Sequence, residues 1–140
     1  MESTYAQEFE VKGGDFLRAG QVSTQIKAIL KEIGINHSVI RRIAICAYEA
    51  EMNVVMYAQK GKILFSVNPR EMQIAIEDEG PGIEDIELAM REGYSTATSE
   101  MQEMGFGAGM GLPNIKKNAD NFHISSVVGK GTKLQIGVVI

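Results

Sequence analysis

The chain has 140 residues, a formal net charge of −4 at pH 7, 44% hydrophobic residues and a single cysteine. This length and composition are typical of one globular domain spanning residues 1–140. The negative charge argues against a broad nucleic-acid or anionic-membrane interface, and one cysteine excludes an internal disulfide framework.

The sequence carries no targeting or membrane-spanning signal. The N-terminal stretch MESTYAQEFEV lacks the basic and apolar regions of a signal peptide. No apolar run reaches the roughly 20 residues of a transmembrane helix, and the cysteine usage fits a reducing compartment. We therefore expect a cytoplasmic protein with neither a membrane nor a nucleic acid as a direct partner.

The first half of the chain changes from a strand pattern to a helix pattern. Residues 5–11 alternate, which predicts a strand, and the apolar residues of 15–33 fall near helical spacing, which predicts a helix. Ser38 is a suitable N-cap for a second helix, which is expected to run to about Gln59 and to be stopped by Gly61.

The second half contains two hairpins separated by helices and a loop. In chain order we expect strands over 62–68 and 72–77, a short helix over 84–91, a loop over 93–111, a helix over 113–121, and strands over 122–128 and 132–140. The order β-α-α-β-β-α-loop-α-β-β predicts an α+β fold. Its expected form is a two-layer α/β sandwich, with a mainly antiparallel mixed sheet and helices on one face.

Two polar residues of the second helix are four positions apart. Glu49 and Asn53 are therefore neighbours on the helix surface, on the side away from its apolar stripe. An amide oxygen can coordinate Mg²⁺ there, while the carboxylate orients or deprotonates a water or hydroxyl. Glu51 projects toward the apolar side and is the poorer candidate. The alternative is an ordinary solvated pair.

The sequence DEGPGI, residues 78–83, follows a predicted strand. Asp78 at the strand end can accept a hydrogen bond from an exocyclic amine such as that of adenine. Gly80 and Gly82 allow the backbone to bend and to approach a planar ligand without a Cβ in between. The alternative is a tight turn between strand and helix.

A glycine-rich run, GFGAGMGLPNIKK, precedes the last predicted helix. Gly105, Gly107, Gly109 and Gly111 would let several backbone N–H groups converge on a phosphate at the helix N-terminus. The spacing fits neither G-x-G-x-x-G nor G-x-x-x-x-G-K-[ST], so this is neither a Rossmann site nor a P-loop. Thr132, in GKGT, can reach a phosphate or simply begin a strand. The alternative for the glycine run is a flexible surface loop.

Together, these stretches resemble the GHKL ATPase superfamily, whose domain is also called the Bergerat ATP-binding fold. EAEMN (49–53) is similar to its N-box, DEGPG (78–82) to its adenine-binding box, GFGAGMGL to its glycine-rich lid box, and Gly131-Thr132 to its late G-T pair. Over roughly residues 40–134, YEAEMNVVMYAQKGKI, DEGPGIEDIELAMREGYST and GLPNIKKNADNFHISSVVGKGT are similar to the small bacterial serine kinases and anti-sigma factors.

The resemblance implies an ATP- and Mg²⁺-dependent serine/threonine protein kinase of the anti-sigma type that phosphorylates a STAS-domain partner. Carried over by position, Glu49 is the catalytic base or water-orienting acid, and Asn53 is the Mg²⁺ ligand. The adenine amine is bound by Asp78, with Gly80 and Gly82 beside the base, and the phosphates are bound by the four lid glycines with help from Thr132. The family analogy also implies a homodimer.

Two other hypotheses remain open from the sequence. One is a non-catalytic module in which the presence of ATP versus ADP decides the order of the 93–111 segment and so gates attachment to a sigma factor or another regulatory partner. The other is a degenerate domain that binds no nucleotide. A sensor histidine kinase is disfavoured, because only His37 precedes the N-box and it lies in a short INHS turn.

Overall fold

The computed structural model describes residues 5–91 and 111–140. Its elements are β1 (Tyr5–Lys12), a 3-10 turn (Phe16–Arg18), α1 (Gln21–Ile33), α2 (His37–Tyr57), β2 (Lys60–Val67), β3 (Glu71–Glu79), α3 (Ile86–Ala89), α5 (Gly111–Asn118), β4 (Asn121–Val127) and β5 (Gly131–Val139). The order of strands and helices confirms the predicted α+β class.

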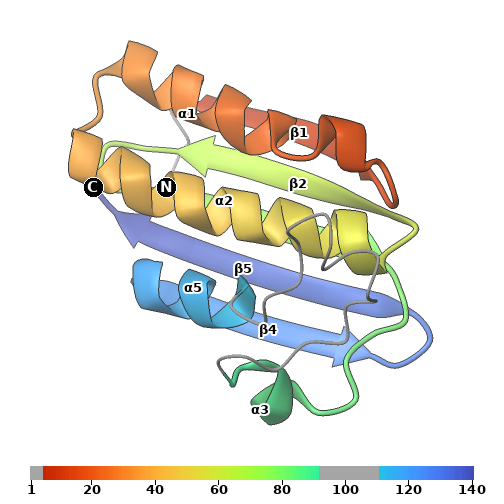
Figure 1. Ribbon diagram of the computed structural model, residues 1–140. Helices are drawn as coiled ribbons and strands as arrows, with labels where there is room; N and C mark the ends of the chain where they lie inside the picture. The colour runs from red at the N-terminus through yellow and green to blue at the C-terminus, as the bar shows by residue number, and fades with distance from the viewer. Residues whose placement is uncertain (1–4, 92–110) are drawn as a thin grey trace.

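The five strands form one sheet in the order β1-β2-β3-β5-β4, and each neighbouring pair is antiparallel. The predicted mixed sheet is thus antiparallel at every strand pair in the part of the chain described. Helices α1, α2 and α5 lie side by side on one face, with α2 in the middle (Figure 1). This arrangement confirms the two-layer sandwich with helices on one face.

The hydrophobic core lies between this sheet and the helices. Alternate residues of the strands, such as Ile63, Phe65 and Ile74, are fully buried, because successive side chains of a strand point to opposite faces. The other face of the sheet carries charged side chains. Two examples are the cross-strand ion pairs Lys60–Glu79 at 3.2 Å and Lys133–Glu77 at 3.4 Å.

Three boundaries in the first half of the chain differ from the prediction. The helix expected over 15–33 is interrupted at Gly20, which has φ +96°, so α1 begins only at Gln21. The N-cap of α2 is Asn36 and not Ser38, because Asn36 Oδ1 accepts the backbone N–H of Ser38 at 2.8 Å. Gly61 does not stop a helix; it lies within β2, opposite Asp78.

The later boundaries differ by a few residues. Helix α3 spans only Ile86–Ala89, because the Asp85 side chain caps it and residue 84 lies outside. Helix α5 begins at Gly111 and ends at Asn118, so Asn121 starts β4 and does not end a helix. Both hairpins are confirmed by their registers. The predicted loop over 93–111 lies outside the described residues, except for Gly111.

Candidate functional site

Glu49 and Asn53 lie on the face of α2 that meets the start of α5. A β-carbon at Gly111 would lie 3.3 Å from Glu49 Oε2 and 3.3 Å from Asn53 Oδ1. Glycine therefore lets the first residue of α5 approach both polar groups closely. The structure brings together these three residues, which the sequence assigned to two separate motifs.

Glu49 is half-buried, and its ionisation reflects that position. Burial raises the pKa of Glu49 above its ordinary value, and a hydrogen bond with the Asn114 side chain acts in the opposite direction. Desolvation disfavours the charged carboxylate, whereas a donor to the carboxylate favours it. A carboxylate with a raised pKa is suited to accept a proton from a hydroxyl, because its basicity is higher than that of an exposed Glu.

Glu51 has a different role, although it lies only two residues from Glu49. Its side chain is 2% exposed and accepts the backbone N–H groups of Gly20, Val22 and Ser23 at 3.0, 3.2 and 3.1 Å. These are donors at the start of α1 that have no partner within the helix. Glu51 thus projects into the core, as the sequence indicated, and caps α1.

Asp78 lies at the end of β3, on the face of the sheet that the helices cover. Its Oδ1 accepts the backbone N–H of Thr132 at 3.1 Å. Burial raises the pKa of Asp78, and the hydrogen bond from Thr132 lowers it. Asp78 is thereby held where the end of β3 meets the start of β5. Thr132 lies beside this residue, which is expected to bind the adenine, whereas the resemblance grouped Thr132 with the phosphate-binding glycines.

Glycines surround Asp78 at positions where a side chain would clash, at Gly131, or be crowded, at Gly80 and Gly61. A β-carbon at Gly131 would lie 2.0 Å from the Asp78 carbonyl oxygen, and one at Gly80 would lie 3.1 Å from Asp78 Oδ1 and 3.2 Å from Ala58 Cα. A β-carbon at Gly61 would lie 3.3 Å from Asp78 Cβ and 3.0 Å from the methyl groups of Val54. The backbone can therefore pack closely around this carboxylate.

The DEGPGI turn packs against the β4–β5 hairpin through Gly82. This residue has φ +76°, and a β-carbon on it would lie 2.5 Å from the Val127 carbonyl oxygen. The Pro81 carbonyl also accepts the Gly129 N–H at 2.8 Å. Gly80 thus lies against Asp78, and Gly82 lies against the β4–β5 hairpin; their place beside a nucleotide base stays a prediction. Gly105, Gly107 and Gly109 lie outside the described residues.

Sequence reasoning missed Ser126, a half-buried residue of β4. Its Oγ accepts the backbone N–H of Ile83 at 2.7 Å, donates to the Gly131 carbonyl at 3.0 Å and lies 2.9 Å from Thr132 Oγ1. The strand alternation places Ser126 on the same face as the apolar residues Phe122 and Ile124. A hydroxyl on that face was the available signal, since such a group needs partners.

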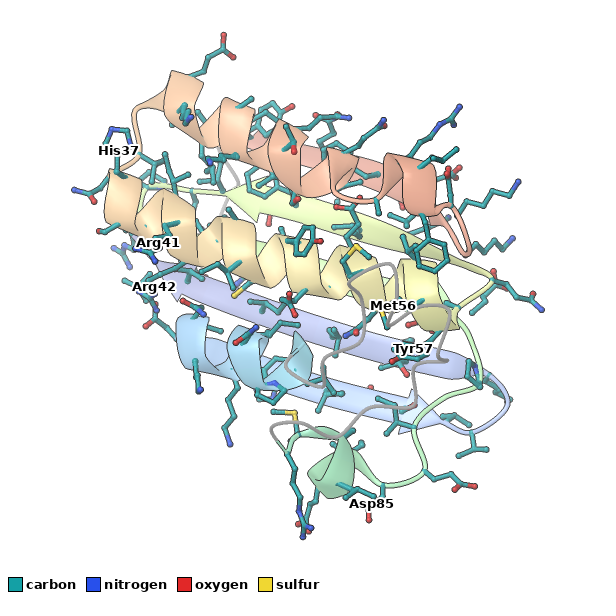
Figure 2. The ribbon with its side chains drawn as sticks, viewed as in Figure 1. His37, Arg41, Arg42, Met56, Tyr57 and Asp85 are labelled. Atoms are coloured by element: carbon teal, nitrogen blue, oxygen red, sulfur yellow. The ribbon has the colours of Figure 1, made fainter. Side chains whose placement is uncertain are left out.

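The polar groups of the site lie toward the C-terminal half of α2. Figure 2 shows His37, Arg41 and Arg42 at one end of this helix, and Met56 and Tyr57 at the other. At the basic end Arg42 donates to the Asn118 carbonyl at 3.0 Å and pairs with Asp120 at 2.9 Å. Arg42 thus ties α2 to the end of α5, away from Asp78.

The described side chains of the site offer too few donors to hold a metal ion alone, but they suit Mg²⁺ that is also bound by water and phosphate. Among residues 5–91 and 111–140, no three His, Cys, Asp or Glu side chains are clustered to hold a metal ion. The carboxylate of Glu49 and the amide oxygen of Asn53 are oxygen donors of the kind that Mg²⁺ uses together with water and phosphate.

No helix within residues 5–91 and 111–140 is both long and apolar enough to cross a membrane.

Comparison with known proteins gives one family and several relatives. The family model for the histidine kinase-like ATPase domain matches residues 17–138. The serine/threonine-protein kinase RsbT of Bacillus subtilis is 35% identical over 111 residues, covering 76% of this chain and 77% of that protein. The anti-sigma F factor of Clostridium acetobutylicum is 34% identical over 91 residues, covering 61% of this chain and 60% of that protein.

Similarity to a solved structure extends over almost the whole fold. The catalytic domain of the histidine kinase ThkA superimposes with a TM-score of 0.51 and 14% identity, covering 97% of this chain and 96% of that chain. At this identity the match concerns the fold alone. It agrees with the antiparallel sheet and the single helical layer described above.

Proposed function

Because this chain belongs to the histidine kinase-like ATPase domain family, we propose that it is an ATP-dependent serine/threonine protein kinase of the anti-sigma type. Its proposed substrate is a hydroxyl side chain of a STAS-domain partner. The observation that carries the proposal is the 35% identity to the kinase RsbT, over a stretch of 111 residues. The chain is proposed to act as one domain over residues 1–140, in the cytoplasm.

The nucleotide would be held at two ends of the site. Asp78, with its carboxylate fixed by the Thr132 N–H, would accept a hydrogen bond from the adenine amine, and Gly80 and Gly82 would lie beside the base. Gly111 and the glycines at 105, 107 and 109 would direct backbone N–H groups to the phosphates. This division is supported by where the glycines meet α2: Gly111 lies against Glu49 within the helix, and Gly80 lies against Ala58, its C-cap.

Glu49 would act as the base that accepts the proton of the attacking hydroxyl. Its half-buried carboxylate, with a raised pKa, supports that assignment. Asn53 would supply the amide oxygen for Mg²⁺, which neutralises charge on the transferring phosphoryl group when bound. Most of the catalysis would come from positioning and electrostatic stabilisation, because phosphoryl transfer requires little covalent chemistry from the protein.

The test is transfer from labelled ATP to purified STAS-domain proteins, with Glu49→Ala and a control, Glu32→Ala. Glu32 is exposed near the end of α1 and takes no part in the site. Glu49→Ala should reduce transfer by about 10²- to 10⁴-fold, the usual contribution of a general base, with little change in ATP affinity. If no STAS-domain protein is phosphorylated although ATP binds, the kinase proposal is wrong.

A second candidate is a non-catalytic module that sequesters a sigma factor or another regulatory partner, with the exchange of ATP and ADP switching the attachment. The similarity to anti-sigma F factors favours it. In that case Glu49→Ala should leave nucleotide-dependent capture of the partner intact.

The chain is also proposed to form a homodimer. Sedimentation equilibrium of the same preparations, with and without Mg-ATP, measures this.

A further inference from the structure

The hydroxyl of Ser126 lies where three segments meet. It contacts the turn after β3 through Ile83 N at 2.7 Å, and it contacts the start of β5 through Gly131 O at 3.0 Å and Thr132 Oγ1 at 2.9 Å. Thr132 in turn donates its backbone N–H to Asp78 Oδ1 at 3.1 Å. Thr132 therefore links Ser126 to the Asp78 carboxylate through two hydrogen bonds.

Counting protons determines the direction of these hydrogen bonds. A serine hydroxyl has one proton and two lone pairs. Ile83 N can only donate and the Gly131 carbonyl can only accept, so the single Ser126 proton is directed to Gly131. The contact between Ser126 and Thr132 then requires the Thr132 proton. In this arrangement Ser126 donates once and accepts twice, and all its capacity is used.

The consequence for Thr132 is that its hydroxyl oxygen has only lone pairs left for a ligand. The neighbouring carboxylate of Asp78 is also an acceptor when ionised. This corner of the site is thus rich in acceptors on both residues. An exocyclic amine brings N–H donors to it, whereas a carbonyl oxygen would place its own lone pairs against them and leave them unpaired.

We propose that Ser126 is a specificity-determining positioning residue: by holding the Thr132 hydroxyl as an acceptor, it makes the site select a 6-aminopurine nucleotide over a 6-oxopurine nucleotide. Ser126 does not itself contact the base in this scheme. The inference rests on the proposed nucleotide function, and it gives a role to a residue that the sequence motifs left without one.

The experiment measures the affinities of the full chain for ATP and for inosine triphosphate, with Mg²⁺ present, by titration calorimetry. The wild type should prefer ATP by about 10- to 100-fold, the value of one hydrogen bond to a charged group. In Ser126→Ala, the hydroxyl proton of Thr132 is no longer directed to Ser126, so Thr132 can donate it to a 6-oxo group. The ratio of the two affinities should then fall by about five- to tenfold, mainly through tighter relative binding of inosine triphosphate.

Matched variants separate this role from a packing role. Ser125→Ala changes the neighbouring serine, which is exposed on the opposite face of β4, and should leave the ratio unchanged. Ser126→Thr keeps the hydroxyl and should keep the ratio. If Ser126→Ala does not fold, Ser126→Cys replaces the hydroxyl by a thiol of similar size that accepts the Thr132 proton only weakly, and it should lower the ratio in the same direction.

The outcomes are distinct for the two proposals. If the folded Ser126→Ala protein binds both nucleotides more weakly by the same factor, or if the ratio of the two affinities does not change, the role of Ser126 is overturned. The proposal that the protein binds ATP is then unaffected. A wild-type protein that binds neither nucleotide overturns the proposed function, and the specificity inference with it.

Discussion

At the scale of single residues, Asn114 is expected to set the pH at which Glu49 becomes active as a base. Burial raises the pKa of Glu49, and the hydrogen bond with the Asn114 side chain lowers it. A base must be deprotonated, so the rate of phosphoryl transfer should rise with pH through the Glu49 pKa. Asn114→Ala removes the interaction that favours the charged form and should move this rising limb to higher pH.

The measurement is a pH profile of the single-turnover transfer rate for the wild type and Asn114→Ala. Asn114→Asp is less informative, because it adds a charge beside Glu49. Lys116→Ala, on the exposed side of the same helix, serves as the control and should keep the wild-type profile. A profile in Asn114→Ala that is reduced at every pH without a shift would indicate that Asn114 only maintains packing.

The sequence could point to candidate site residues where a local motif contains them. Glu49, Asn53, Asp78 and Gly80 belong to local patterns, and their spacing already indicates which share a helix face or follow a strand. Ser126 was missed because its partners, Ile83 and Gly131, are 43 and 5 residues away. No local pattern specifies that a serine of one strand will meet a distant turn.

At the scale of elements, α1 should depend on Glu51 for its stability. The carboxylate accepts three backbone N–H groups at or next to the first turn of α1, and Gly20 provides no side-chain cap. Glu51→Ala leaves those buried donors unpaired and should lower the free energy of unfolding by about 2–4 kcal/mol. Urea denaturation followed by circular dichroism measures this loss.

The control for Glu51 is Glu32→Ala, because Glu32 is an exposed acid of α1 itself. An exposed substitution of this kind should change stability by no more than about 0.5 kcal/mol. Glu51→Gln keeps the size of the side chain but only one acceptor oxygen, so an intermediate loss is expected. Equal stability of Glu51→Ala and the wild type would contradict the capping role.

Element types were predictable because strands and helices differ in hydrophobic period, but several ends were not. Gly61 is the kind of residue that often ends a helix, yet it is a strand residue whose backbone lies close to both Val54 and Asp78. Likewise the break at Gly20 follows from the long-range bond to Glu51. In both cases a tertiary contact, which is absent from the local sequence, determines the role of the glycine.

At the scale of the whole molecule, the sheet order brings the two halves of the chain together. Strand β5 pairs with β3 as well as with β4, and the register Glu77↔Lys133 places Asp78 next to Thr132. The sequence predicted both hairpins but contained no signal for this long-range pairing. The fold class was therefore predictable, whereas the grouping of Asp78, Thr132 and Ser126 required the strand order.

This grouping predicts that nucleotide binding stabilises the entire fold through Asp78. A ligand that binds only the folded state adds about 2.7 kcal/mol at a concentration 100 times its Kd. Mg-ATP should therefore raise the Tm of the wild type, as measured by differential scanning calorimetry. In Asp78→Asn the amide can turn an N–H toward the adenine amine, so the ATP-dependent rise should be largely lost.

The matched control is Asp85→Asn on the exposed start of α3 (Figure 2). Asp85 Oδ1 accepts the Leu88 N–H at 3.0 Å, and an asparagine oxygen can make the same cap. Asp85→Asn should keep the full rise in Tm with ATP. If Asp78→Asn keeps it too, while its Tm without ATP matches the wild type, then Asp78 does not bind the base. The nucleotide would in that case have to be held through the phosphate contacts alone.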